Sequence, residues 1–313
     1  MASSRRSALG ALGSTAVAIG AVGAGAVAWG SLVERTRYTL RAFNVPVLPA
    51  GAEPVRLLHL SDLHMAPWQR DKQSWVAALA QLNPDLIVNT GDNLGHENGL
   101  SGIRAAFDPF RGTPGVYVWG SNDYFGPTPK NPMRYFGGPS TMPQRPKDLD
   151  TAGLGRYLDG IGLTALNNTA AVLDVKGTRF EFFGVDDPHR GYDRLDQAAD
   201  ALRTLPDEQG TDAVRIGVAH APYRRVLDDF VDHGAGLLLA GHTHGGQVCL
   251  PGFGALVTNC DLPRQQVKGL SRWEHGEHEA YLHVSAGLGT SIYAPFRFAC
   301  RPEASLLTLV PSA

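Results

Sequence analysis

Residues 55–64 have the sequence Val-Arg-Leu-Leu-His-Leu-Ser-Asp-Leu-His, in which an apolar run is followed directly by an acid and a histidine. A short apolar run of this kind is typical of a buried β-strand. Four more such runs, each with polar residues directly after it, predict strands at Leu86–Asn89, Val116–Trp119, Val214–Ala219 and Leu237–Ala240. Because strand ends in an open α/β sheet can meet along one edge, we expect these polar residues to share one site.

The polar residues form clusters of carboxylates, amides and imidazoles. The clusters are Asp62-Leu63-His64, Gly91-Asp92-Asn93, Gly120-Ser121-Asn122-Asp123, and His220 with Gly241-His242-Thr243-His244. Divalent ions such as Mn, Fe and Zn accept these ligands, and the set is complete without a thiolate. We therefore predict a site for two divalent metal ions. Amidohydrolase and metallo-β-lactamase patterns fit poorly, since both open with His-x-His and this chain opens with Asp62 and His64.

These motifs resemble those of the calcineurin-like metallophosphoesterase superfamily, from about Val55 to the C-terminus. Two further stretches are similar to its bacterial membrane-associated phosphodiesterase subgroup: Gly245-Gly246-Gln247, and the stretch from Gly287 through Arg297 to Glu303. The resemblance implies an α/β fold with two facing mixed β-sheets flanked by helices, a four-layer sandwich. It also implies a dinuclear metal-dependent hydrolase of phosphoric esters.

Carried over position by position, the resemblance assigns the ligands of the two ions. One ion would be held by Asp62, His64 and His244. The second would be held by His220 and His242, and a bridging carboxylate between the ions would come from Asp92.

The segment Gly120–Asp123 departs from the family pattern, which is Gly-Asn-His-Asp. Aligned without a gap, Ser121 takes the place of a ligand to the second metal, and Asn122 takes the place of a histidine near the leaving group. A small loop shift would instead let Asn122 supply its amide oxygen, and we favour Asn122 because a neutral hydroxyl is a weak ligand. In either alignment a histidine is missing, so esters with poor leaving groups should react slowly.

Two more residues are candidates at the site. Asp123 is expected either to orient a group beside the metals or to cap a loop. Arg297 is predicted to contact a substrate phosphate, because a guanidinium can bind two phosphate oxygens at once.

The expected reaction is attack of a hydroxide, generated between two cations, on a phosphorus atom. We expect a phosphodiesterase acting on phosphodiesters or on pyrophosphate-linked lipid or nucleotide-sugar headgroups. A phosphomonoesterase and a non-catalytic metal-binding protein of the cell envelope stay open as alternatives. The formal net charge of −2 and the lack of a basic stripe argue against a nucleic-acid partner.

Residues 1–37 are expected to be a signal or membrane-anchor segment. Arg5 and Arg6 precede an uncharged apolar stretch, residues 8–33, which is long enough to form a transmembrane helix. The arginine pair is similar to a twin-arginine signal, and Ala26-Val27-Ala28 offers a cleavage site, so a cut signal and an uncut anchor are both open. Arg5 and Arg6 favour a cytoplasmic N-terminus, whereas Arg35, Arg37 and Arg41 on the other flank favour the opposite orientation. We expect an exported or membrane-anchored protein whose catalytic domain lies outside the cytoplasm.

The rest of the chain is predicted to form one domain. Residues 38–54 contain Pro46, Pro49 and Gly51 and are predicted to be a linker to a metallophosphoesterase domain over residues 55–313. Helical patterns are present at Ser74–Leu82, Ile103–Phe110, Leu195–Leu205 and Tyr223–Val231. The proline-rich stretch over residues 126–146 is expected to be a loop beside the site, either a lid or a surface insertion.

Overall fold

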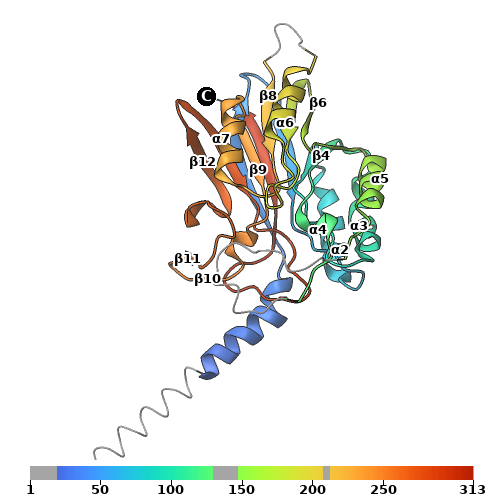
Figure 1. The fold of residues 1–313 in the computed structure, drawn as a ribbon, viewed down its shortest axis with the longest axis vertical. Helices are drawn as coiled ribbons and strands as arrows, with labels where there is room; N and C mark the ends of the chain where they lie inside the picture. The colour runs from blue at the N-terminus through green and yellow to red at the C-terminus, as the bar shows by residue number, and fades with distance from the viewer. Residues whose placement is uncertain (1–19, 130–146, 207–211, 313) are drawn as a thin grey trace, which may run out of the picture.

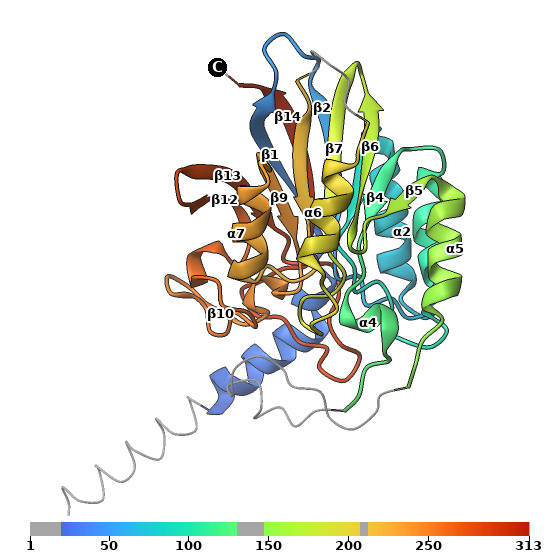
Figure 2. The same ribbon diagram turned by 45° about the horizontal axis from the view of Figure 1, so that its top comes forward.

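The computed structural model describes residues 20–129, 147–206 and 212–312, and in this part of the chain two six-stranded sheets face each other. Helices cover the outer face of each sheet (Figures 1 and 2). The structure is thus the predicted α/β sandwich of four layers. The four segments with helical patterns overlap helices α2 (Arg70–Ala78), α3 (Gly99–Phe107), α6 (Leu195–Arg203) and α7 (Arg224–Asp232), whereas helix α5 (Thr151–Ile161) was not predicted.

The first sheet has the strand order β1-β14-β2-β3-β4-β5. Strands β2 to β5 run parallel to one another, and β14 pairs antiparallel with β2. The bounds are β1 Thr39–Leu48, β2 Val55–Leu60, β3 Leu86–Asn89, β4 Gly115–Tyr117, β5 Leu163–Ala165 and β14 Glu303–Pro311. Strands β2 and β3 have the bounds expected from the sequence.

The second sheet has the order β12-β13-β9-β8-β7-β6. Its four central strands are parallel, and the edge strands β12 and β6 pair antiparallel with their neighbours. The bounds are β6 Thr169–Val175, β7 Thr178–Gly184, β8 Val214–Val218, β9 Leu237–Ala240, β12 Gly269–His275 and β13 His278–Val284. A small hairpin, β10 Cys249–Leu250 and β11 Gly254–Ala255, lies beside it.

Amphipathic helices cover the sheets. Helices α2 (Arg70–Ala78), α3 (Gly99–Phe107) and α5 (Thr151–Ile161) pack on the first sheet, and α6 (Leu195–Arg203) and α7 (Arg224–Asp232) pack on the second. In helix α7, for example, the buried residues recur on one helical face, which packs on the sheet; they are Val226, Leu227, Phe230 and Val231. The short helix α4 (Ser121–Tyr124) and the 3-10 turns η1 (Glu34–Thr36), η2 (Leu79–Leu82), η3 (Asp108–Phe110), η5 (His244–Gly246) and η6 (Arg264–Gln266) complete the elements.

The apolar core between the sheets holds the two strand sets in place. Val88 and Val116 of the first sheet belong to the same buried cluster as Ile216 and Leu239 of the second. All residues of β3 and of β9 are buried, because each strand is covered on both faces. This packing fixes the ends of the two parallel strand sets opposite each other.

The prediction of a linker over residues 38–54 was wrong, because residues 39–48 form strand β1. Strand β1 pairs with β14 along one side only, so it is an edge strand. An edge strand tolerates a proline, and the register shifts between Pro46 and Leu48. Val45 and Leu48 are buried in the core between the sheets. The folded domain therefore includes β1.

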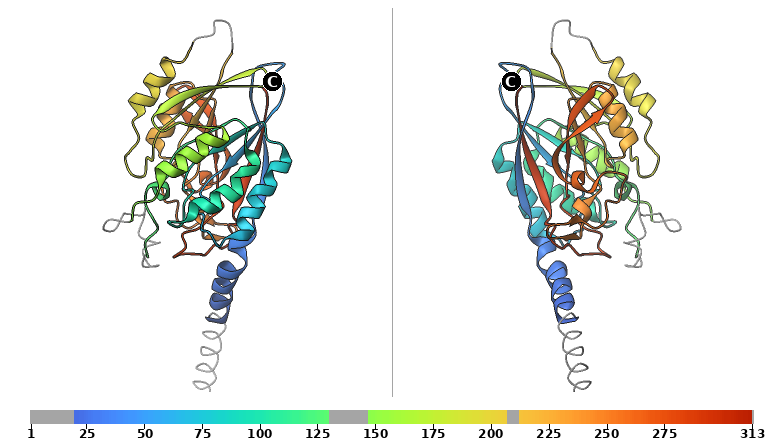
Figure 3. Two further views of the ribbon diagram at one scale, coloured as in Figure 1. Left: turned by 90° about the vertical axis from the view of Figure 1, so that its right-hand side faces the viewer. Right: turned by 90° about the vertical axis from the view of Figure 1, so that its left-hand side faces the viewer.

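Residues 20–32 are helical and project from one end of the sandwich (Figure 3). The main-chain N–H of Arg297 donates to the carbonyl of Gly30 at 3.2 Å, which ties this helix to the domain. In the described part of the chain, no helix combines the length and the apolar character needed to cross a membrane. Residues 8–19 of the expected apolar helix, with Arg5 and Arg6, lie outside the described residues, and so do residues 130–146 of the proline-rich stretch.

Candidate metal centre

The four clusters lie on loops that directly follow strands β2, β3, β4, β8 and β9. Strands β2 to β4 are parallel within the first sheet, and β8 and β9 are parallel within the second. The loops after them consequently leave the same edge of each sheet. The sheets face each other, and the loops of both meet as expected from the sequence.

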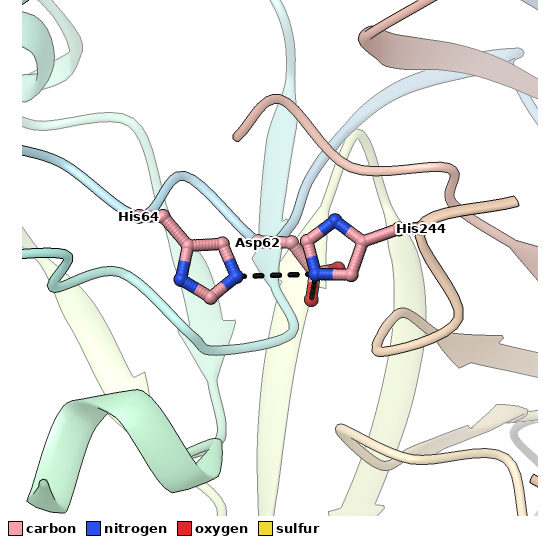
Figure 4. Close-up of side chains that lie close together, drawn as sticks. All are labelled: Asp62, His64 and His244. Carbon is pink, nitrogen blue, oxygen red and sulfur yellow. Dashed lines mark hydrogen bonds and ion pairs between the residues drawn. The ribbon is translucent and has the colours of Figure 1, made fainter. Parts of the chain in front are cut away.

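The first half of the site consists of Asp62, His64 and His244, which can place one ligand atom each within 4.8 Å of the others. The Nε2 atoms of His64 and His244 are 3.1 Å apart and point toward each other (Figure 4). The Oδ1 atom of Asp62 lies 3.6 Å from His244 Nε2. Asp62 is buried, so its charge requires a nearby cation or several donors.

Asp92 connects this half with the second. One oxygen, Oδ2, lies 3.5 Å from His64 Nε2, and the other, Oδ1, lies 3.6 Å from His220 Nε2. The Nδ1 atom of His242 lies 3.2 Å from His220 Nε2. Asp92 therefore has the position that the resemblance assigns to a bridging carboxylate. Asp62 also belongs to a group with Asp92 and His220, so both acids lie between the histidines.

The donor set fits divalent cations. Burial lowers the pKa of His64 to about 4, and it holds the pKa values of His242 and His244 well below their usual range. These imidazoles are thus neutral, which is the form that binds a metal. Burial lowers the pKa of His220 as well, but the carboxylates of Asp92, Asp62 and Asp187 together raise it to about 9. A positive charge is therefore strongly favoured between the carboxylates.

Backbone carbonyls orient the histidine rings from the side away from the site. His220 Nδ1 lies 2.7 Å from the carbonyl of Thr90, and His244 Nδ1 lies 3.1 Å from that of Gly289. These contacts turn each Nδ1 away from the site, so that each Nε2 faces it. His242 is turned the other way, with its Nε2 3.0 Å from the side-chain amide nitrogen of Asn259 and 3.2 Å from the carbonyl of that residue, which leaves Nδ1 for the site.

The backbone of the site is strained. Positive φ angles occur at ligand residues, namely Asp62 (50°), His64 (41°), Asp92 (54°), His242 (67°) and His244 (50°). Such angles are uncommon outside glycine and concentrate at functional sites, where the surrounding structure holds them. Position 120 requires a glycine, because a Cβ there would collide with the Asp92 carboxylate and the His220 ring.

The segment Gly120–Asp123 places Asn122, and not Ser121, beside the acid. The side-chain amide of Asn122 donates to Asp92 Oδ2 at 2.8 Å, and its main-chain N–H donates to Oδ1 at 2.7 Å. The Ser121 hydroxyl instead donates to the carboxylate of Asp187. Of the two residues, Asn122 is therefore the one whose side chain lies at Asp92.

Asp123 is buried and accepts three main-chain hydrogen bonds. The donors are the N–H groups of Asp92 at 2.8 Å, Asn93 at 2.8 Å and Gly120 at 2.9 Å. Burial, together with the nearby Asp92 carboxylate, raises the pKa of Asp123 to about 7. Asp123 therefore caps α4 and also fixes the backbone of Asp92.

The structure contradicts the prediction that Arg297 contacts a substrate phosphate, because its side chain is 0% exposed. Its Nη2 atom donates to the carbonyls of Ala286, Gly287 and Gly289 at 2.8, 3.0 and 2.7 Å. The same atom lies 3.3 Å from Nδ1 of His244. Arg297 therefore holds the loop over residues 286–289, whose Gly289 carbonyl contacts the ring of His244.

Replacing Arg297 by lysine should destabilise the fold while keeping the charge. The Nη2 atom of Arg297 reaches three carbonyls while its Nη1 atom faces those of His244 and Cys300. A lysine has a single nitrogen and cannot serve both groups, so we expect a loss of about 2 kcal/mol in the free energy of unfolding. Urea unfolding followed by circular dichroism measures this loss. The exposed Arg301, changed to lysine, is the control and should leave the midpoint unchanged. Equal midpoints for the two variants would contradict the supporting role of Arg297.

The sequence analysis missed the loop over residues 185–192. The ring centroid of His189 lies 4.5 Å from that of His242, and the buried Asp187 accepts from Ser121. A signal was present, since Asp186-Asp187 comes shortly after the apolar strand β7, as the other clusters come after theirs. It was missed because none of the motifs that carry the family resemblance lies in this loop.

Comparisons with known proteins agree with this geometry. The uncharacterized metallophosphoesterase YkuE of Bacillus subtilis (strain 168) is 25% identical over 291 residues, which cover 89% of this chain and 86% of that protein. The phosphodiesterase YaeI of Escherichia coli (strain K12) is 27% identical over 266 residues, covering 83% and 84%. A Danio rerio transmembrane protein with metallophosphoesterase domain is 28% identical over 218 residues, covering 65% of this chain and 44% of its own length.

The family model of the calcineurin-like phosphoesterases matches residues 55–246. That match spans more than half of the 313 residues and runs from strand β2 to the residues just after His244. It includes every strand end that carries a ligand. The chain belongs to the calcineurin-like phosphoesterase family.

Proposed function

We propose that this protein is a dinuclear metal-dependent phosphodiesterase. Its substrates would be phosphodiesters or pyrophosphate-linked lipid or nucleotide-sugar headgroups. The observation that carries the proposal is Asp92, whose two oxygens face histidines of opposite halves of the site. The relative named phosphodiesterase YaeI supports the diesterase assignment.

The ligands divide between two ions. Asp62, His64 and His244 would hold one ion, and His220 and His242 would hold the other, with Asp92 shared. Asn122 would add its amide oxygen to the second ion, after rotation of the amide that now donates to Asp92. Mn, Fe and Zn all suit this mixture of carboxylate, amide and imidazole. When bound, two such ions generate the attacking nucleophile and neutralise charge on the phosphoryl oxygens.

The protein contributes orientation through Asp123. Its carboxylate fixes the main chain of Asp92 and of Gly120, which belong to the two loops that meet at the second ion. Groups beside a metal are commonly held by such outer hydrogen bonds. Asp123 is thus proposed as a positioning residue, and it does not itself contact the substrate.

The missing histidine predicts a strong dependence on the leaving group. An amide at position 122 cannot protonate a departing alkoxide, so an alkyl phosphodiester should be cleaved far more slowly than an aryl one. Changing Ser121→Asn together with Asn122→His restores the family segment, in which position 121 supplies the amide ligand in place of Asn122 and position 122 supplies the acid. Alkyl ester cleavage should then be faster by roughly a hundredfold or more. The rate ratio of the two esters, measured in both proteins, tests this. An unchanged ratio would show that another group supplies the proton.

We also propose that the chain is anchored in a membrane by its N-terminal segment, with the catalytic domain outside the cytoplasm. The apolar sequence over residues 8–33 supports this, as does the exposure of Val22, Val27 and Leu32 on the helix. The relative with a transmembrane name is compatible with it. Protease accessibility of the domain in intact cells, compared with lysed cells, tests the orientation.

The function is tested on the full chain in detergent, because the buried Glu34, which follows the N-terminal helix, is bonded to the domain. Its Oε1 atom accepts from the main-chain N–H of Cys300 at 2.8 Å. The protein is stripped of metal, reloaded with Mn or Zn, and assayed with an aryl phosphodiester and an aryl phosphomonoester. Metal-restored diester cleavage supports the proposal. Cleavage of the monoester alone would indicate a phosphomonoesterase, and metal binding without turnover would indicate the non-catalytic alternative.

A further inference from the structure

The loop after strand β7 lies against the second half of the metal centre. The carbonyl of Asp187 accepts the main-chain N–H groups of Arg190 at 3.2 Å and of Tyr192 at 3.1 Å, which closes a tight turn. One Asp187 side-chain oxygen accepts the N–H of His189 at 2.9 Å, and the other accepts the Ser121 hydroxyl. The turn and the segment beside Asp92 are therefore bonded to each other.

His189 fixes the same turn from another side. Its ring packs against the ring of His242, with centroids 4.5 Å apart, and its Nδ1 atom lies 2.9 Å from the hydroxyl of Tyr223. His242 is a proposed ligand of the second ion. The turn is thus held against the second half of the site by two independent contacts, one between Asp187 and Ser121 and one between His189 and His242.

The turn over residues 187–192 carries one arginine, Arg190. Its Nε atom donates to Ser121 Oγ at 3.2 Å, and its guanidinium carbon lies 4.5 Å above the ring of Phe125. The side chain remains partly exposed. Burial lowers the pKa of Arg190, while the Asp187 carboxylate acts in the opposite direction. An arginine stays charged throughout the usual pH range.

We propose that Arg190 binds a non-bridging phosphoryl oxygen of the substrate and that Ser121 orients it for this role. The proposal rests on the phosphoesterase function proposed above. Ser121 precedes Asn122, which bonds Asp92, and the turn that carries Arg190 packs on His242 through His189. The guanidinium therefore lies in the half of the site that contains His242. A guanidinium suits a phosphoryl group because it offers two parallel N–H donors. Ser121 stands at the position of a metal ligand in the family, but its hydroxyl accepts a hydrogen bond from Arg190 instead of binding a metal.

The test compares Arg190→Gln with the matched variant Arg194→Gln in the full chain loaded with Mn. Arg194 is exposed, and its side chain bonds only main-chain carbonyls of Gly191 and Asp193 in the described residues. Calorimetry with inorganic phosphate gives the dissociation constant, and the aryl phosphodiester gives KM and kcat. Arg190→Gln should raise the phosphate dissociation constant and KM by about tenfold to a hundredfold, with metal content unchanged. Arg194→Gln should change neither.

Two further variants separate binding from structure. Arg190→Lys keeps the charge without the fork and should recover part of the phosphate affinity. Ser121→Ala leaves the arginine in the chain and should weaken phosphate binding by about two- to fivefold, since one orienting hydrogen bond is lost. This variant decides the question if Arg190→Gln does not fold.

The outcomes distinguish this inference from the proposed function. Arg190-dependent phosphate binding in a protein without turnover would sustain the inference and overturn the phosphodiesterase proposal. Metal-dependent turnover with the same phosphate affinity and KM in Arg190→Gln as in the unchanged chain would overturn the inference alone. A metal-loaded chain that binds no phosphate at millimolar concentration would overturn it as well.

Discussion

Replacing Asp92 by alanine should lower kcat/KM for an aryl phosphodiester by more than about a thousandfold, which corresponds to about 4 kcal/mol of transition-state stabilisation. Asp92 is the carboxylate whose two oxygens lie 3.5 Å from His64 Nε2 and 3.6 Å from His220 Nε2. Without it neither half of the site keeps its full set of donors, and the negative charge that balances two cations is reduced. The effect should therefore exceed that of losing one terminal ligand.

The measurement combines kinetics with metal content by mass spectrometry. The Asp92→Ala protein should retain less than the full metal complement of the unchanged chain. Asp92→Asn keeps the shape but not the charge, and it should also be strongly impaired because an amide is a weaker ligand for a shared position. The exposed Asp71 of helix α2, changed to alanine, is the control and should have no effect. Turnover above one tenth of the normal rate in Asp92→Ala would show that the two halves act independently.

Replacing Asp123 by alanine should destabilise the protein and impair turnover together. The carboxylate accepts from three main-chain N–H groups, those of Asp92, Asn93 and Gly120, and it is buried. Each buried donor without a partner costs about 1–3 kcal/mol, so we expect the free energy of unfolding to fall by about 3 kcal/mol or more. Turnover should fall by roughly a hundredfold, since a shift of about 1 Å in a catalytic group has that effect.

Asp123→Asn provides the matched comparison. Its remaining amide oxygen can accept from part of the donor set, while its amide nitrogen faces an N–H and cannot accept from it. We therefore expect a stability between those of the alanine variant and the unchanged chain, measured by urea unfolding of the metal-free proteins. A free energy of unfolding within about 0.5 kcal/mol of that of the unchanged chain is typical of a surface substitution. Such a result for the alanine variant would show that the three hydrogen bonds do not hold the Asp92 loop.

Local sequence was sufficient for the strands that carry the site. Strands β2, β3 and β9 begin and end where the apolar runs do, because strands covered on both faces appear as continuous apolar segments. Four of the helices were predicted as well, since α7, for example, repeats its apolar residues with helical spacing, but helix α5 was not. Strand β1 was not, because an edge strand with Pro46 has the local appearance of a linker and is defined by its pairing with β14.

The sequence by itself determined the ligand types, their order along the chain and their positions directly after apolar strands, since these depend on residues next to one another. Only the tertiary structure decided which atoms meet. The pairing of Asp92 with His64 and His220, the choice of Asn122 over Ser121, the burial of Arg297 and the approach of Arg190 to Ser121 all join residues from separate loops. Such contacts follow from how two sheets pack and which way each loop turns, and neither is encoded in the spacing of a motif.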